Sequence, residues 1–225
     1  MKALATNLQA FTVIDLLVGV ALLLVVSALL LPRFAERGCT LRPQCNNNLK
    51  NIGLAFKQAS LDSNDRYPMQ RPVAGGGTLE LVENGQAWVH FQVISNELIT
   101  PRVLICPQEK NRKRYCATTF AVSATHSDVP FSGNCNVSYF VGVDAADLYP
   151  NMWLAGDANF SIDGVPVQAG LVSLFTNAPL TWTDKRHSGC GNVVFADGSV
   201  RELCNSDLIA ALCSTGDPTN RLDLP

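Results

Sequence analysis

Residues 11–31 read FTVIDLLVGVALLLVVSALLL, an apolar run in which Asp15 is the single charged side chain. An α-helix of this length is ~31 Å long, which is close to the thickness of the hydrocarbon core of a bilayer. A carboxylate at the middle of such a helix costs about 2.5–3.5 kcal/mol, and less near an end, where Asp15 lies. The stretch therefore predicts an N-terminal transmembrane helix over 11–31, with a positively charged partner for Asp15.

The length of this run separates it from an ordinary secretory signal, whose apolar core has about 7–15 residues. One interpretation is a plain, uncleaved anchor helix. The other comes from residues 11–17, FTVIDLL, which resemble the type IV prepilin signal, Phe-Thr-Leu-Ile-Glu-Leu-Leu after a Gly. The resemblance implies that a prepilin peptidase cuts between Ala10 and Phe11, methylates Phe11 and leaves the helix on the protein.

In that family the acid meets the N-terminal amine of a neighbouring subunit during filament assembly, which assigns a filament role to Asp15. The amine has an unperturbed pKa of about 7.7–8.0 and is charged at neutral pH. The chain departs from the family pattern in having Ala10 in place of Gly, Asp15 in place of Glu, and Lys2 as the lone basic residue of its leader.

A second helix is predicted over 44–59, because apolar residues recur there at three- and four-residue steps. Its sequence NLKNIGLAFK at 48–57, continuing to Tyr67-Pro68, is similar to the block that follows the prepilin helix in many bacterial pseudopilins. Gly38 and Pro43 argue against one straight helix through 38–43.

The C-terminal third contains the most specific motif, HSGCGNVVFADGSV at 187–200. Asp197-Gly198 between two apolar runs predicts a β-hairpin with a two-residue turn. Nine residues separate His187 from Asp197-Gly198, which matches the His-x9-Asp-Gly signature of a large group of bacterial prepilin-type proteins. Short blocks at 137–139, 155–157 and 106–107 (Cys-Pro) are also similar to that group.

Elsewhere the sequence predicts strands at 103–107, 116–122, 137–143 and 153–157, a strand or short helix at 88–94, and loops at 69–86 and 123–134. The basic run at 109–114 is typical of a solvated loop rather than of a nucleic-acid site.

The chain has eight cysteines, all after the apolar run and without a Cys-x-x-Cys pair, which favours disulfides formed in an oxidising compartment. Buried free thiols are the alternative. Eight cysteines allow 105 pairings. Proximity in sequence favours Cys39–Cys45, Cys106–Cys116 and Cys204–Cys213, leaving Cys135 with Cys190.

Two roles are open for His187: a proton carrier or metal ligand, or a hydrogen bond that fixes the loop before the hairpin. His187 and Cys190 have ligand-like spacing, but the sequence does not indicate the remaining ligands.

The motifs of serine hydrolases, zinc proteases, dinucleotide-binding folds and P-loops are absent, so no catalytic residue and no enzyme activity is predicted. No cofactor is predicted either, except that Asp144, Asp157 and Asp197 are weak candidates for calcium by analogy with type II secretion pseudopilins.

A formal net charge of −2 gives no reason to expect a nucleic-acid partner. Basic residues flanking a membrane helix tend to stay in the cytoplasm. Arg33, Arg37 and Arg42 follow the apolar run and Lys2 alone precedes it, so charge by itself favours a cytoplasmic C-terminal domain. The cysteines and the prepilin resemblance place the C-terminal domain in the periplasm.

Together these features predict a pilin-like α+β fold, in which a long N-terminal helix packs on an antiparallel sheet with a loop-rich, disulfide-containing C-terminal region. The predicted parts are a leader (1–10), a transmembrane helix (11–31), the periplasmic half of the helix (32–66) and a globular domain (67–225). The predicted function is structural: a single-pass inner-membrane pseudopilin that assembles with copies of itself or other pseudopilins into a filament for type II secretion or a related system. The alternative is a membrane-anchored periplasmic binding module that forms no filament.

Overall fold

The computed structural model describes residues 13–35, 41–121 and 127–225, with side chains in all of these ranges except 27–35 and 41–42. The chain divides into two compact units between Leu41 and Arg42. The predicted leader, the cleavage position at Ala10 and Phe11, and Cys39 lie outside the described residues.

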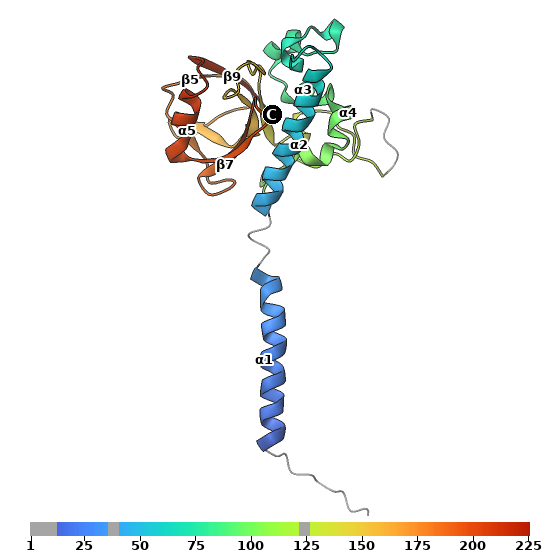
Figure 1. Ribbon diagram of the computed structural model, residues 1–225, viewed down its shortest axis with the longest axis vertical. Helices are drawn as coiled ribbons and strands as arrows, with labels where there is room; N and C mark the ends of the chain where they lie inside the picture. Colours follow the sequence, from blue (N-terminus) through green and yellow to red (C-terminus); the bar gives the residue numbers. More distant parts are fainter. Residues whose placement is uncertain (1–12, 36–40, 122–126) are drawn as a thin grey trace, which may run out of the picture. The chain divides into compact units, whose positions relative to one another are not determined.

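The first unit contains helix α1, Val13–Ala35 (Figure 1). It passes through Pro32, so the predicted 11–31 helix is helical from Val13 and ends four residues later than expected. Asp15 lies in its first turn, where a carboxylate is favoured by the helix dipole. In the described part of the chain, no helix meets the combined requirement of length and apolar character for crossing a membrane.

Helix α2, Leu41–Leu61, lies in the second unit from Arg42 onward and confirms the amphipathic helix predicted at 44–59. Pro43 is accommodated because it lies in the first turn, where backbone N–H groups have no partner within the helix. One face of α2 is fully buried and includes Cys45, Leu49 and Phe56. This face packs on the main β-sheet.

Among the described residues, six strands form an antiparallel sheet. In spatial order they are β5 (Gly170–Phe175), β9 (Thr219–Leu224), β1 (Tyr139–Gly142), β2 (Trp153–Asp157), β7 (Cys190–Phe195) and β8 (Val200–Cys204). Every adjacent pair is antiparallel. The predicted strands at 137–143 and 153–157 are confirmed.

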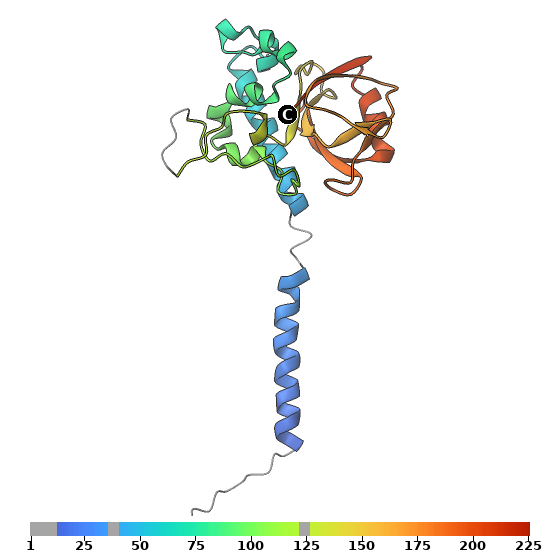
Figure 2. The same ribbon diagram turned by 180° about the vertical axis from the view of Figure 1, so that it is seen from behind.

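The sheet is covered on both faces, as alternate residues along β1 show. Tyr139 and Val141 join a hydrophobic cluster with α2, whereas Phe140 joins a second cluster on the other face. That second face is covered by helix α5 (Asn205–Cys213) and by a small antiparallel sheet of the described strands β4 (Val165–Pro166), β3 (Phe160–Ile162) and β6 (Leu180–Trp182). Figure 2 shows the same arrangement from behind. The α+β class, the antiparallel sheet and the presence of disulfides are therefore as predicted.

The region between α2 and β1 is built from short helical segments. They are η1 (Pro68–Gln70), η2 (Val73–Gly75), η3 (Leu79–Asn84), α3 (Ala87–Gln92), α4 (Ser95–Leu98), η4 (Pro101–Leu104) and η5 (Asn134–Asn136). The predicted loop at 69–86 thus contains three short 3-10 helices, and the 88–94 segment is helical rather than extended.

Two predicted strands in this region are wrong. Residues 101–104 form a 3-10 helix, because Pro101 fixes a helical φ at its first position and Thr100 Oγ1 accepts a hydrogen bond from the Arg102 N–H. The described part of the other segment, 116–121, contains no strand and has one isolated bridge, between Thr119 and Pro130.

The predicted β7–β8 hairpin is confirmed, but its turn has three residues instead of two. Phe195 accepts a hydrogen bond from the Gly198 N–H and donates one to the Ser199 carbonyl. Gly198 has a positive φ of 83°, whereas Asp197 does not have the positive φ that a two-residue type I′ turn requires. Residues 195–198 therefore form a hydrogen-bonded turn that ends in a left-handed glycine.

Candidate functional site

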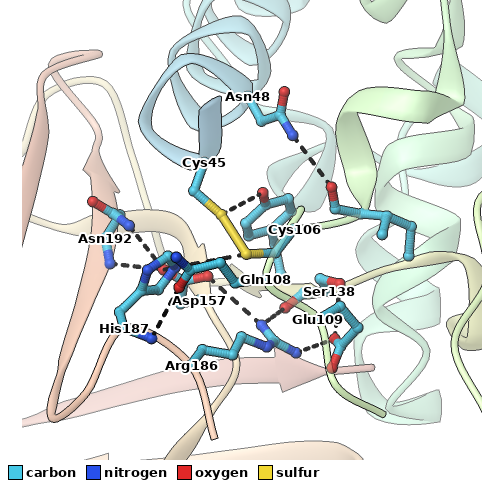
Figure 3. The surroundings of a disulfide bond; sticks show 12 residues. Cys45, Asn48, Cys106, Gln108, Glu109, Ser138, Asp157, Arg186, His187 and Asn192 are labelled. Atoms are coloured by element: carbon cyan, nitrogen blue, oxygen red, sulfur yellow. Dashed lines mark hydrogen bonds and ion pairs between the residues drawn. A yellow bond between two sulfur atoms is a disulfide. The ribbon is translucent and has the colours of Figure 1, made fainter. Parts of the chain in front are cut away.

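Four buried side chains from distant parts of the sequence meet beside the main sheet: Cys45, Cys106, Asp157 and His187. We call them the quartet. One sulfur, nitrogen or oxygen atom from each lies within 4.8 Å of those from the other three. Figure 3 shows them converging around the Cys45–Cys106 disulfide.

The disulfide joins α2 to the segment that follows η4. Cys45 lies on the buried face of α2, one turn before Asn48. The Asn48 side-chain amide donates a hydrogen bond of 3.2 Å to the Ile105 carbonyl, next to Cys106. The helix and the loop are therefore held together by a hydrogen bond as well as by the covalent bond.

Asp157 is the last residue of β2 and has no exposed surface. Its Oδ2 accepts hydrogen bonds from the Asn192 backbone N–H (2.8 Å) and side-chain amide (3.1 Å) on the neighbouring strand β7. Its Oδ1 accepts no hydrogen bond and lies 3.6 Å from Arg186 Nη1. A buried carboxylate is costly unless such partners compensate its charge.

His187 is positioned by an uncommon backbone conformation. His187, Ser188 and Gly189 have consecutive positive φ values of 48°, 50° and 76°. A non-glycine residue held in this region costs of order 1–3 kcal/mol and is a recurrent feature of functional sites. The turn directs the His187 ring so that Nε2 lies 3.6 Å from Cys106 Sγ and 3.4 Å from Asp157 Oδ2.

A charged network lies beside the quartet. Arg186 donates a 2.8 Å hydrogen bond to the Ser138 carbonyl and is paired with Glu109, whose Oε2 also accepts a hydrogen bond of 2.9 Å from Ser138 Oγ. Arg114 lies 3.6 Å from the same carboxylate oxygen. Burial and the neighbouring charge of Arg186 lower the pKa of Arg114 to about 10, so this guanidinium remains charged at neutral pH.

The geometry differs from a nucleophile–base–acid triad. In such a triad the two ring nitrogens of the histidine face different partners. In this site the same Nε2 atom faces both the cysteine sulfur and the carboxylate. The arrangement therefore suits ligands that converge on one point rather than a proton relay through the ring.

Tyr139 completes the wall of the site, with its hydroxyl 3.6 Å from Cys45 Sγ. Burial, and secondly the negative charge of Asp157, raise the pKa of Tyr139, so its hydroxyl is protonated at all ordinary pH values. The site thus offers a neutral donor on the side of Cys45 and a carboxylate on the side of His187.

The disulfides predicted from proximity in sequence are wrong. Cys106 is bonded to Cys45 rather than to Cys116, and Cys204 is bonded to Cys190 rather than to Cys213. Cys190 and Cys204 are directly opposite on β7 and β8, and Cys45 reaches Cys106 through helix packing, so tertiary neighbours outweigh sequence neighbours. Cys116, Cys135 and Cys213 are free thiols.

The three calcium candidates have separate surroundings. Asp144 is paired with Arg221 at 2.6 Å, Asp157 belongs to the quartet, and Asp197 Oδ1 accepts a hydrogen bond of 2.8 Å from the Ser199 N–H in the hairpin turn. Within the described residues, the quartet is the one group of at least three His, Cys, Asp or Glu side chains that could hold a metal.

Comparison with known proteins finds no matching family model, no similar curated protein and no similar solved structure. The sequence singled out His187, Asp157 and the Cys106-Pro107 block but did not bring them together. It missed Arg186, Glu109 and Asn192. The one available signal was adjacency, since Arg186 precedes His187 and Glu109 follows Cys106-Pro107 by two residues.

Proposed function

We propose that the chain is a pilin-like structural subunit, anchored in a membrane and assembled through its N-terminal helix. The observation that carries the proposal is the exposure of apolar side chains along the whole described part of α1. Val13, Leu17 and Leu23 expose 74%, 63% and 71% of their surface. The other large apolar side chains between Ile14 and Val26 are also exposed.

An apolar helix surface that continues around all sides of a helix is stable only in lipid or against other helices. A soluble, freestanding α1 would expose this surface to water. The prepilin-like sequence at 11–17 supplies the more specific part of the proposal, namely processing before Phe11 and assembly through Asp15. The packing of α2 on an antiparallel sheet is compatible with a pilin-like domain and supports the proposal at the level of fold class.

The test is the intact mass of the chain purified from a bacterial host that expresses a prepilin peptidase. The proposal expects a mass that lacks residues 1–10 and carries one methyl group on Phe11. A peptidase-deficient host is the matched control and should give the unprocessed chain. A full-length, unmethylated chain in the peptidase-positive host would contradict the proposal.

Crosslinking through α1 separates a filament subunit from a tethered monomer. Pairs of cysteines placed on opposite sides of α1, in a background lacking Cys116, Cys135 and Cys213, should give ladders of oligomers on mild oxidation, because each subunit can then bond to two neighbours. A tethered binding module would give monomers alone.

A basic cleft favours binding of an anionic ligand as a second candidate function. A cavity of about 760 Å³ is lined by the loop at 109–114, by Lys185 and by polar residues such as Gln168. Lys110, Arg112, Lys113 and Lys185 are exposed and form no ion pair within the described residues. Such a cleft would take an anionic polymer.

Binding of heparin, used as a model polyanion, tests this second function. Replacing Lys110 and Lys113 by alanine should weaken binding, whereas replacing Arg66 and Arg102, which are exposed elsewhere, should not. Equal binding by both double variants would exclude the cleft as the site.

A further inference from the structure

We propose that Cys45, Cys106, Asp157 and His187 form a zinc site in the dithiol state of the chain, and that the Cys45–Cys106 disulfide is the oxidised form of the same centre. The inference concerns the second unit and does not depend on filament assembly.

The separations between ligand atoms support a tetrahedral metal. Zinc binds nitrogen and oxygen at about 2.0–2.1 Å and thiolate sulfur at about 2.3 Å. A tetrahedron with these bonds has ligand edges of about 3.4 Å between nitrogen and oxygen and about 3.6 Å between nitrogen and sulfur. His187 Nε2 lies 3.4 Å from Asp157 Oδ2 and 3.6 Å from Cys106 Sγ.

The ligand types fit the same metal. Two thiolates, one imidazole and one carboxylate are all ligands that zinc accepts in proteins. The outer contacts are also typical of a metal site, because Asn192 fixes the Asp157 carboxylate with two hydrogen bonds. Asp157 Oδ1 is buried and accepts no hydrogen bond, so this carboxylate has unused acceptor capacity.

The net charge of the buried site is compatible with a bound zinc ion. In the disulfide form, the carboxylates of Asp157 and Glu109 are balanced by the guanidiniums of Arg186 and Arg114. Reduction adds two thiols, which are neutral while they keep their protons. A zinc ion that displaces both protons adds two positive charges to two thiolates, so the buried site has the same net charge with the metal bound as in the disulfide form.

Metal and disulfide exclude each other, because two sulfurs bonded to one another cannot both act as thiolate ligands. A small two-electron oxidant such as hydrogen peroxide would interconvert the states. One thiolate attacks the peroxide to give a sulfenic acid, and the second thiolate displaces its oxygen as water. The two Zn–S bonds break, one S–S bond forms, the peroxide takes two electrons and two protons to give two waters, and Zn²⁺ leaves.

The experiment uses the full chain in detergent micelles, reduced with a phosphine under anaerobic conditions and separated from excess reagent. We expect one zinc ion per chain by elemental analysis. With cobalt in place of zinc, we expect a thiolate-to-cobalt charge-transfer band and the intense visible bands of a tetrahedral site. Addition of peroxide should release the zinc to a chromogenic chelator, with one disulfide formed per ion released.

Variants locate the metal. The Cys45→Ser/Cys106→Ser variant should lose the thiolate band, and Asp157→Asn or His187→Gln should weaken zinc binding by at least about 100-fold. Asn192→Ala, which removes a contact to Asp157, should weaken it about 10–100-fold. Cys190→Ser/Cys204→Ser is the matched control, because it removes the other cysteine pair and should retain the metal.

Three results would overturn the proposal: no stoichiometric metal in the reduced wild-type chain, a cobalt complex without thiolate bands, or equal metal binding by the Cys45→Ser/Cys106→Ser variant. The first two use the wild-type chain alone and remain decisive even if a variant fails to fold.

Discussion

Gly53 of α2 lies directly against Val194 of β7, so that a Cβ atom built on Gly53 would be 2.6 Å from Val194 Cγ2. This close approach allows α2 to rest on the sheet. Gly53→Ala gains roughly 1 kcal/mol of helix propensity, but we expect overpacking of about 1–3 kcal/mol to outweigh it and lower the free energy of unfolding. All three tryptophans lie in the second unit, so urea unfolding followed by their fluorescence reports this change.

Val194→Ala should relieve that clash, so the double variant should be more stable than the sum of the single changes predicts, by about 1 kcal/mol or more. Gly75→Ala is the control, because its added Cβ meets Pro72 at an ordinary 3.7 Å. Additive effects of Gly53→Ala and Val194→Ala would contradict the packing.

The carboxylate of Asp197 in the hairpin turn makes the free energy of unfolding of the second unit dependent on pH. Burial raises the pKa of the Asp197 carboxyl, but hydrogen bonds from Ser199 and the charges of Arg201 and Lys57 outweigh it, so the pKa is lowered overall. The unfolded chain therefore binds this proton more readily than the folded chain. The stabilisation is present above the unfolded pKa of about 3.9 and is lost as pH falls through the lower folded value.

Asp197→Asn should accordingly be less stable than wild type at pH 7, and the difference should shrink as the pH falls below about 4. Urea unfolding at a series of pH values measures it. Asp163→Asn, in the exposed turn after β3, is the comparison that controls for general loss of a surface carboxylate. A difference that is constant with pH would show that the Asp197 charge has no role.

The cysteine pairing can be mapped on the oxidised chain. Alkylation without reduction should modify the exposed Cys116 and Cys213, and proteolysis should then give linked peptides that join Cys45 to Cys106 and Cys190 to Cys204. Peptides joining Cys106 to Cys116 would contradict the fold around the quartet, and peptides joining Cys204 to Cys213 would contradict the bond between β7 and β8.

Asp15 should matter for assembly rather than for insertion. If its carboxylate meets the amine of a neighbouring subunit, Asp15→Ala should insert in the membrane normally but fall to a small fraction of its wild-type amount in sheared filaments. Asp15→Glu should keep the charge and assemble, and Asp62→Ala, at an exposed position just after α2, should behave as wild type. Normal filament incorporation of Asp15→Ala would remove the proposed role of this residue.

Local signals in the sequence predicted the elements whose patterns are regular. The apolar steps from Leu49 to Ala59 predicted α2, and Asp197-Gly198 between apolar runs predicted the β7–β8 hairpin. The segment at 103–107 has an equally apolar pattern, but Pro101 and the Thr100 cap make residues 101–104 a 3-10 helix. β9, at 219–224, was not predicted, because Leu222 and Leu224 are its two apolar residues and its pairing with β1 and β5 is a long-range contact.

The candidate site could not be predicted from the sequence either, because it too depends on long-range contacts. His187, Asp157 and Cys106 were each noticed, yet they are separated by 30 residues or more and meet through the pairing of β2 with β7 and the packing of α2. Proximity in the chain therefore pointed His187 to Cys190, whereas folding brings it to Cys106.

The Cys190–Cys204 disulfide bears on how neighbouring copies of the domain can associate. β8 is an edge strand, and edges of sheets are where identical domains merge into aggregates. The bond ties the end of β8 to β7, and Arg201 and Glu202 place charges along the exposed strand. Many copies of this domain held side by side would therefore resist fusing through their sheets, so close contact between neighbours would stay reversible.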